Sequence, residues 1–266
     1  MARHPSFRLN LGICLLMLAL AFTFMAGGLP PGRVAASMDH LLTFSPWVGY
    51  FQNADLHPNY LNGDIVSQQL PWRTWAQDEF GAGRFPLWAS GPLGGYPIFA
   101  NAQSSVLHPL HLLWILMPVG AGFGIILALK LWLSGVGMWA LLRAQGLHPS
   151  GALFGSLGLM FSAYIVNWLP WNLSSTYLIF PWLLWSVYVW WTTRSAYTLA
   201  LLVLFVAIAV LGGHPETLFI MGVATAVWLA GLLLTGLKDR WLLKIGALVP
   251  AVVLGLGMGA VQLLPF

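Results

Sequence analysis

Seven long apolar segments, nearly free of charge, limit what this chain can fold into. A run of roughly 20 apolar residues crosses the hydrocarbon core of a bilayer, about 30 Å thick, as a helix that satisfies its own backbone hydrogen bonds. Only 7% of the residues are charged and 59% are apolar, unlike soluble domains. We therefore predict an all-α polytopic membrane protein with about seven transmembrane helices, forming one domain over residues 1–266. The predicted spans are residues 11–29, 120–142, 151–166, 173–191, 196–211, 217–234 and 242–264.

The first apolar segment is interpreted as a retained helix rather than a cleaved signal peptide. Signal peptides usually have an apolar core of about 7–15 residues, and residues 11–29 exceed it, although Val34-Ala35-Ala36 resembles a processing site. The single cysteine, Cys14, excludes an intrachain disulfide and a cysteine-based metal site. The eleven lysines and arginines are scattered at segment ends, so nucleic acid is not an expected partner.

Lysine and arginine residues predict the orientation of the chain, because short cytoplasmic loops carry most of them. The short connections 167–172 and 212–216 contain none. We therefore expect these two connections and the long polar segment 30–118 to lie together on the extracytoplasmic face, with the N-terminus in the cytoplasm. In this orientation the inner segments contain Arg3, Arg8, Arg143, Arg194, Lys238, Arg240 and Lys244.

The polar segment 30–118 is expected to carry the functional site, because it concentrates the acidic residues. Apolar side chains recur at helical spacing over residues 71–80, which predicts a helix lying in the membrane interface. Asp64 follows an Asn-Gly turn signal and can cap a helix that begins there. A second short helix is predicted over residues 108–116. The segment holds five of the seven acidic residues: Asp39, Asp55, Asp64, Asp78 and Glu79.

An ordered set of short motifs resembles the first outer loop and later spans of YfhO-type bacterial membrane proteins. The loop motifs are Asn62-Gly63-Asp64, Phe85-Pro86-Leu87-Trp88, Gly94-Gly95-Tyr96-Pro97, Asn101-Ala102-Gln103-Ser104 and His108-Pro109-Leu110. The later motifs are Trp171-Asn172, Pro181-Trp182, Gly212-Gly213-His214-Pro215-Glu216-Thr217 and Gln262-Leu263-Leu264-Pro265. The resemblance covers nearly the whole chain from Asn62 onward. Family members are usually longer, so we expect this chain to correspond to their N-terminal part.

The family is similar to GT-C glycosyltransferases, multi-span enzymes that use polyprenyl-phosphate sugars and place a catalytic Asp in the first outer loop. The resemblance implies a GT-C-like fold in the bacterial cytoplasmic (inner) membrane, with an extracytoplasmic site. It also implies transfer of a sugar from a polyprenyl-phosphate donor to an acceptor of the cell envelope. By this resemblance Asp64 is the catalytic acid or base.

Sugar transfer from a lipid phosphate also requires positive charge, or a metal, near the departing phosphate. Arg73 and Lys130 are the candidates. Lys130 lies near the middle of an apolar span, where an ionisable side chain usually turns toward the bundle interior. The alternatives are that Lys130 extends to an interface along its aliphatic stem and that Arg73 faces lipid headgroups.

Other polar and aromatic residues on the same face are candidates for substrate binding. His214 and Glu216 form a polar pair that, together with Asp64, offers ligands for a divalent cation. The alternative is that this pair belongs to a turn that caps the next span. The remaining candidates are Trp88 and Trp171 as sugar-stacking platforms, with Asn101, Gln103 and Asn172 as hydrogen-bonding groups.

Two other functions stay open at this point. A transporter or flippase for a lipid-linked or small polar solute would have inverted repeats and polar residues deep in several spans, whereas here the spans are nearly free of charge apart from Lys130. A noncatalytic assembly protein would tolerate Asn in place of Asp64. The chain has no Walker-type phosphate loop and no dinucleotide fingerprint, which disfavours direct use of nucleotide sugars.

Overall fold

The structure is a computed structural model that describes residues 7–50, 59–91, 94–234 and 240–264. Over these ranges the chain forms helices and loops, with one isolated antiparallel bridge between Ala89 and Tyr96. The predicted all-α class is therefore confirmed. In the described part, five helical segments are long and apolar enough to cross a membrane, which indicates a membrane protein: Phe7–Phe24, Val119–Ala144, Pro149–Trp168, Pro215–Leu234 and Trp241–Met258.

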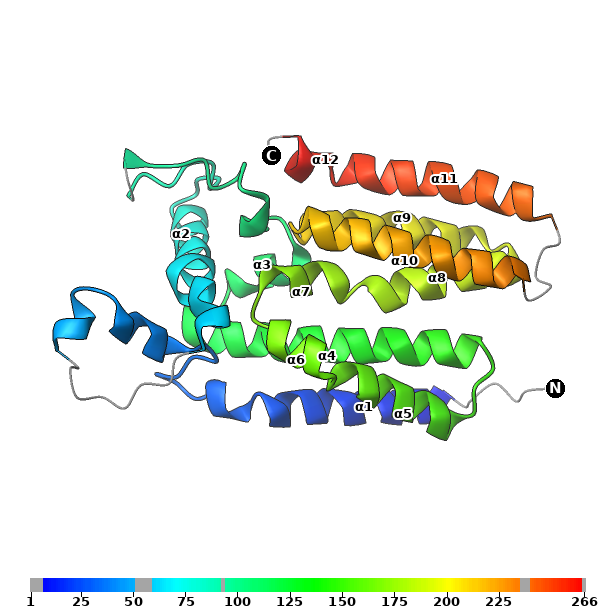
Figure 1. Cartoon of the computed structure of the whole chain (residues 1–266), viewed down its shortest axis with the longest axis horizontal. Helices are drawn as coiled ribbons and strands as arrows, with labels where there is room; N and C mark the ends of the chain where they lie inside the picture. Colours follow the sequence, from blue (N-terminus) through cyan, green and yellow to red (C-terminus); the bar gives the residue numbers. More distant parts are fainter. Residues whose placement is uncertain (1–6, 51–58, 92–93, 235–239, 265–266) are drawn as a thin grey trace.

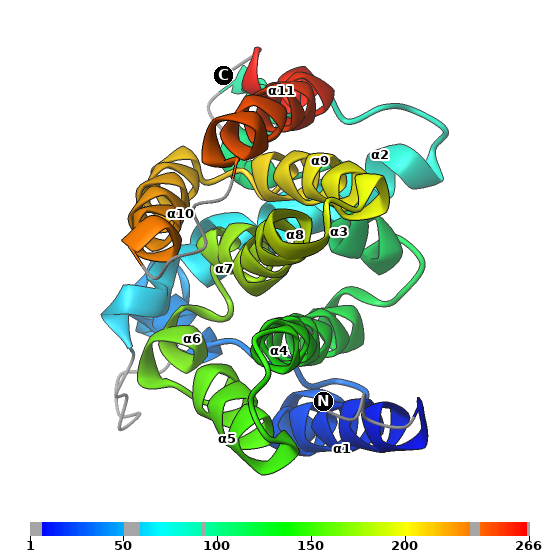
Figure 2. The same cartoon turned by 90° about the vertical axis from the view of Figure 1, so that its right-hand side faces the viewer.

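The long helices lie side by side in a bundle (Figure 1). Viewed from one end, α4 lies between α1 and α5 on one side and α8 and α9 on the other (Figure 2). α4 packs against α1, α5 and α8, while α9 packs against α8 and α11. The bundle consists of α1 (Phe7–Phe24), α4 (Val119–Ala144), α5 (Pro149–Met160), α6 (Ala163–Trp168), α7 (Asn172–Tyr177), α8 (Phe180–Thr193), α9 (Ala196–Leu211), α10 (Pro215–Leu234), α11 (Trp241–Met258) and α12 (Ala260–Leu263).

Two of the predicted spans are broken into shorter helices. Ser162 separates α5 from α6, and its Oγ accepts a hydrogen bond from the backbone N–H of Ile165 (3.3 Å). Pro181 restarts the helix in the first turn of α8, after α7 has ended at Tyr177. Neither α7, α8 nor α9 alone is among the five long apolar segments. The count of seven spans therefore stays a prediction.

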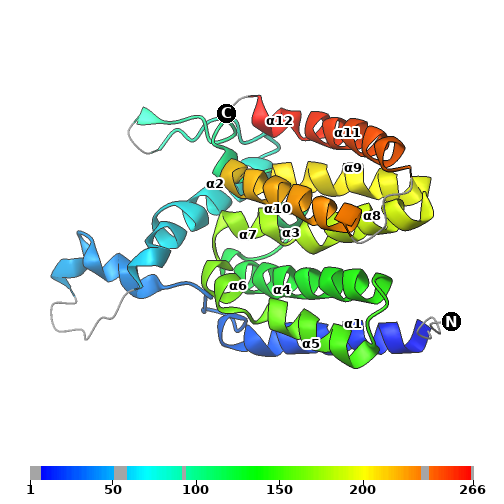
Figure 3. The same cartoon turned by 45° about the vertical axis from the view of Figure 1, so that its right-hand side comes forward.

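The three segments expected on one face do lie at one end of the bundle. The chain between α1 and α4, the α6–α7 turn and the α9–α10 turn meet there, while α1 begins at the opposite end (Figures 1 and 3). The α4–α5 and α8–α9 connections, which contain Arg143 and Arg194, also lie at the opposite end. Assignment of the first end to the extracytoplasmic side rests on the distribution of lysine and arginine.

A helix crosses this end of the bundle, as the spacing of residues 71–80 predicts. α2 (Leu70–Gly81) has Pro71 in its first turn, and Gly83, at φ +72°, follows its end. A π-helical stretch, Ile65–Gln69, precedes α2 without a break. The second predicted helix is α3 (Pro109–Trp114), which returns the chain toward α4.

The loop after α2 has its own small hydrophobic core. Trp72, Ala89 and Ile98 are buried together, with Trp75 and Tyr96 packed against them. Ala89 and Tyr96 exchange two backbone hydrogen bonds of 2.9 Å. This core holds the loop against α2, and Gln262 of α12 donates to the backbone oxygen of Phe99 (2.9 Å), which ties the loop to the bundle as well.

Candidate functional site

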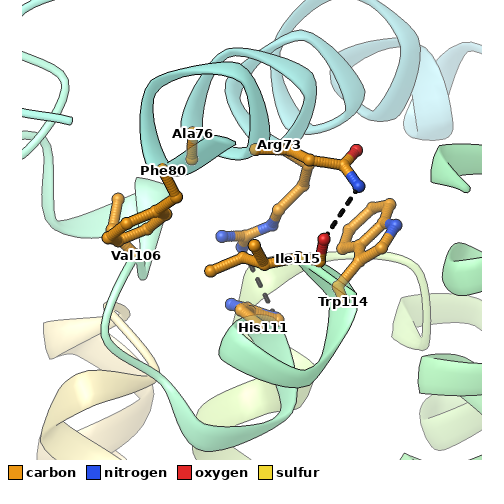
Figure 4. A pocket seen from close by; sticks show the side chains of 8 residues that line it. Arg73, Ala76, Phe80, Val106, His111, Trp114 and Ile115 are labelled. Carbon is orange, nitrogen blue, oxygen red and sulfur yellow. Dashed lines mark hydrogen bonds between the residues drawn. The ribbon is translucent and has the colours of Figure 1, made fainter. Parts of the chain in front are cut away.

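Arg73 on α2 is the centre of a buried polar cluster between α2, α3, α4 and α7. Its guanidinium donates to the backbone oxygen of Ser104 and to Asn172 Oδ1 (3.0 Å). Figure 4 shows the guanidinium pointing from α2 toward His111, with Trp114 beside it; the centroid of the indole lies 5.9 Å from the guanidinium carbon. Burial lowers the pKa of Arg73 to about 9. The side chain is enclosed by protein rather than directed toward lipid headgroups.

His111 on α3 is a neutral member of this cluster and contacts Arg73, the Ser105 backbone and Ser175. Its Nδ1 lies 3.0 Å from the backbone oxygen of Ser105, and because a carbonyl only accepts, we assign the ring proton to Nδ1. Nε2 is then the acceptor for Ser175 Oγ (3.1 Å) and Arg73 (3.4 Å). Burial, reinforced by the positive charge of Arg73, holds the pKa of His111 well below its ordinary value.

A chain of hydrogen bonds joins the three segments that meet at this end. Asn172 Nδ2 donates to Ser105 Oγ (3.0 Å), and Ser105 Oγ donates to the backbone oxygen of Gly212 (2.7 Å). Gly213 follows at φ +74°, and a Cβ there would collide with the backbone oxygen of Ala102. The turn before α10 therefore requires glycine, both for its conformation and for its close contact with the loop.

Lys130 on α4 lies inside the bundle and not at an interface. Its side chain is only 4% exposed, and Nζ donates to Ser174 Oγ at 2.7 Å. Ser174 in turn donates to the backbone oxygens of Leu169 (2.8 Å) and Trp171 (2.6 Å). Lys130 is thereby tied to the α6–α7 turn, on which Asn172 also lies.

Neither buried cation has a carboxylate partner among the described residues. The ion pair seen there joins Arg84 to Glu79 (2.7 Å) on the surface after α2. The described acidic side chains are all at least partly exposed, and Asp55 and Asp239 lie outside the described residues. Two basic side chains, Arg73 and Lys130, therefore lie buried without a compensating acid among the described residues.

Asp64 lies on the same helical stretch as Arg73 but in a different setting. It has helical dihedrals (φ −65°, ψ −21°), and its side chain forms no capping hydrogen bond. Its half-buried carboxylate has no hydrogen-bonding or ionic partner among the described residues, so the predicted cap is wrong. The neighbouring Asn62 accepts a hydrogen bond from Trp171 Nε1 (3.1 Å). This bond places the start of the stretch beside the α6–α7 turn.

The other predicted binding residues are spread over this end of the molecule. Trp88 is 54% exposed and its indole covers Gly95 within the loop after α2. Asn101 Oδ1 accepts from the backbone N–H of Gln103 (3.2 Å), which closes a short 3-10 turn. Both side chains are half-buried. Of the predicted residues, Arg73, Lys130, Trp171 and Asn172 come together, while Trp88 lies apart in the loop.

His214 caps α10, as expected if His214 and Glu216 belong to a capping turn rather than to a metal site. Its Nδ1 accepts from the backbone N–H of Thr217 (3.2 Å) and lies 2.8 Å from Thr217 Oγ1. Burial lowers the pKa of His214, and the nearby Glu216 partly offsets this effect. Within the described ranges, no three His, Cys, Asp or Glu side chains are placed to hold a metal ion. The divalent-cation site suggested for His214, Glu216 and Asp64 is therefore not formed.

Several residues of the cluster were not singled out from the sequence. The signal present in the sequence is the polar run at 174–176 within an apolar segment, together with two histidines three positions apart. Buried polar groups of this kind need partners, so this pattern would have been sufficient to indicate a polar site inside the bundle. The residues missed are Gln69, His111, Ser174 and Ser175.

The fold defines an all-α membrane protein with a buried cationic cluster at one end. Comparison with models of protein families, with curated proteins and with solved structures finds no match to this chain. We therefore argue its function from the residues of the site.

Proposed function

We propose that this chain is a membrane glycosyltransferase that transfers a sugar from a polyprenyl-phosphate donor to an extracytoplasmic acceptor of the bacterial cell envelope. The observation that carries the proposal is the Asp64 carboxylate, half-buried and free of partners among the described residues, on the helical stretch that also carries the buried Arg73. The motif resemblance to YfhO-type proteins and GT-C enzymes agrees with this assignment.

Asp64 is assigned the role of general base. In the proposed step the acceptor hydroxyl attacks the anomeric carbon, and its proton passes to the Asp64 carboxylate. The bond between the anomeric carbon and the phosphate oxygen breaks, and its electron pair leaves with the polyprenyl phosphate. A carboxylate that capped a helix would already be engaged by backbone N–H groups, whereas Asp64 keeps its oxygens free.

Arg73, and Lys130 in its protonated form, favour the departing phosphate through their electric field. The two cavities beside Arg73 are each about 10 Å³, the size of one water molecule, so the phosphate group of the donor does not fit into either. In a poorly solvated site, unpaired charges act over longer distances than in water. Because no buried acid opposes them, they favour the growth of negative charge nearby.

Apolar grooves on the bundle suit an isoprenoid chain. One of about 210 Å³ runs between α3, α4, α8 and α9 and is lined by His108, Leu133, Trp182 and Ile208, among others. His108 connects this groove to the cluster, because its ring lies 4.9 Å from that of His111. A larger groove of about 470 Å³ lies between α8, α9, α10 and α11, away from the cluster.

The test is sugar transfer in membrane vesicles that contain a radiolabelled polyprenyl-phosphate sugar. Wild type is compared with Asp64→Asn and, as a matched control, with Asp78→Asn, which alters an exposed acid of α2. Loss of transfer in Asp64→Asn alone, at equal protein level, supports the proposal. Equal transfer by all three proteins excludes Asp64 as the base. Movement of the labelled lipid across the membrane without transfer would favour the transporter, and neither activity would favour the assembly protein.

A further inference from the structure

An apolar groove runs along α10, between this helix and α8, α9 and α11. α10 packs mainly against α7 and α9, whereas α11 packs against α9, and Figure 2 shows α10 and α11 separated. The groove has a volume of about 470 Å³. Thr225 is the one polar side chain in its lining, and its hydroxyl already donates to the backbone oxygen of Met221 (2.7 Å). The groove therefore offers hydrocarbon contacts rather than a polar site.

The groove follows one face of α10 over most of the helix. Its lining includes Pro215, Leu218, Gly222 and Leu229, which are three, four and seven residues apart, the spacing of a single helix face. At a rise of about 1.5 Å per residue, the stretch 215–229 is about 21 Å long. A volume of about 470 Å³ over this length corresponds to a mean cross-section of about 22 Å². The groove is therefore long and narrow, about 5 Å wide.

This width accommodates one hydrocarbon chain. Carbon atoms in contact lie about 4 Å apart, so an extended chain fills such a groove along its length. A transmembrane helix, with a diameter of about 10–12 Å including its side chains, does not enter it. An empty groove would leave its whole lining without dispersion contacts. The occupant that fits is a lipid tail rather than a segment of protein.

The charge at the mouth of the groove selects the headgroup of that lipid. The groove reaches the end of the bundle at Pro215, the first residue of α10, and Glu216 follows it. Glu216 is exposed and forms no ion pair among the described residues. No lysine or arginine lines the groove. A carboxylate at this position attracts an amine and repels a phosphate monoester, which favours an aminophospholipid over a polyprenyl phosphate.

We propose that this groove binds one acyl chain of a phospholipid with an amine headgroup, phosphatidylethanolamine, whose amine lies beside Glu216. The second acyl chain of the lipid stays in the surrounding bilayer. The bound chain fills the space that separates α10 from α11. This site is distinct from the groove beside His108, and the proposal does not depend on the glycosyltransferase assignment, because it rests on the shape and charge of a different part of the bundle.

Native mass spectrometry of the detergent-solubilised full chain counts the lipids that it retains. After delipidation, equal amounts of phosphatidylethanolamine, phosphatidylglycerol and polyprenyl phosphate are added back. We expect one phosphatidylethanolamine per chain at saturation. Preferential retention of either anionic lipid would overturn the proposal. So would a lipid-free dimer, which would show that a second copy of the chain covers the groove.

Two glycine variants locate the bound chain. A Cβ at Gly222 meets no atom within 4 Å, so Gly222→Leu places its side chain in the groove without a clash and should weaken lipid binding about tenfold. Gly231→Leu is the matched control, because it makes the same exchange on the same helix, also in open space, at a residue outside the lining. It should bind lipid like wild type. Equal binding by the two variants, at equal thermal stability, would place the lipid elsewhere and overturn the proposal.

Glu216→Gln tests the choice of headgroup. It should lower the preference for phosphatidylethanolamine over phosphatidylglycerol about threefold, as expected for one exposed charge pair, while a lipid is still retained. Asp78→Asn, which alters an exposed acid of α2, is the control and should keep the preference of wild type. An unchanged preference in Glu216→Gln would overturn the assignment of the amine. Sugar transfer is assayed separately, so failure of the glycosyltransferase proposal and failure of this one are distinguishable.

Discussion

Asp64 and Arg73 lie nine residues apart on one continuous helical stretch, yet their side chains have opposite surroundings. Arg73 is enclosed and bonded to the loop, to α3 and to α7, whereas the Asp64 carboxylate is half-exposed and unpartnered among the described residues. A side chain with many buried bonds contributes to stability, and its removal leaves other polar groups without partners. A carboxylate without such bonds contributes little to the fold and is available for chemistry. Substitutions along this stretch should therefore separate stability from activity.

The largest effect is expected for Asp64→Asn on sugar transfer. Loss of a general base costs about 10³-fold in rate, while the free energy of unfolding should change by less than about 0.5 kcal/mol because no described contact is lost. Initial transfer rates and thermal unfolding of the same preparation measure both quantities. A large loss of stability in this variant would mean that Asp64 is part of the fold, and the contrast with Arg73 would then be wrong.

Arg73→Ala should lower the stability of the protein, in contrast to Asp64→Asn. It leaves the backbone oxygen of Ser104 and Asn172 Oδ1 buried without their donor, which should lower the free energy of unfolding by about 3 kcal/mol. Denaturant or thermal unfolding in detergent measures the loss. Arg84→Ala is the control, since Arg84 is exposed and pairs only with Glu79 in the described structure. It should unfold like wild type, and an equal loss in both variants would contradict the role given to the cluster.

Lowering the pH should decrease the free energy of unfolding through the buried His108. Burial lowers the pKa of His108 to about 3, helped by the charges of Lys130 and Arg73 and slightly opposed by the backbone of Ser175. The unfolded chain takes up this proton near pH 6.5, so the stability contributed by the neutral ring is complete above that pH and declines as the pH falls toward 3. At pH 5 the loss attributable to His108 is about 2 kcal/mol.

His108→Phe tests this pH dependence. Phe keeps an aromatic ring in the same place and cannot titrate, and it gives up only the weak contact of His108 with the backbone of Ser175. The variant should lose less stability than wild type between pH 7 and pH 5. The unfolding midpoints of the two proteins at both pH values give the difference, and parallel curves would show that His108 is not a buried neutral histidine.

The smallest effect on stability is expected for substitution of His214. Its side chain is half-buried and bonds only within the first turn of α10. His214→Ala removes the acceptor for the backbone N–H of Thr217 and should cost about 1 kcal/mol in unfolding free energy. His148→Ala provides a comparison at the other end of the bundle, where an exposed histidine caps α5 through a longer bond to the Ser150 N–H (3.4 Å). Thermal unfolding should rank His214→Ala below His148→Ala in stability. The opposite order would show that the α10 turn is less tightly held than its contacts indicate.

The helices around the site were predictable from local patterns. Helical spacing and flanking proline and glycine gave α2 and α3 nearly to the residue, because those signals act within one or two turns. The expected convergence of the loop with the two short turns was also found, since alternating spans must bring every second connection to the same end. The breaks after Met160 and Tyr177 were missed, because the hydropathy of each segment is continuous across the break. Ser162 and Pro181 mark where the next helices begin, but each can also occur within a continuous apolar segment.

The sequence by itself determined that this is an apolar helical protein with its polar residues gathered at one end, because hydropathy and spacing depend only on neighbours along the chain. Tertiary structure decided which partners the polar residues of the site have. Arg73 became part of a buried network because Ser104, His111 and Asn172 come to it from distant segments. Asp64 kept a free carboxylate because the helix extends through it and leaves it no cap to form. Whether a polar group is bonded depends on partners far away in the chain, which no local pattern contains.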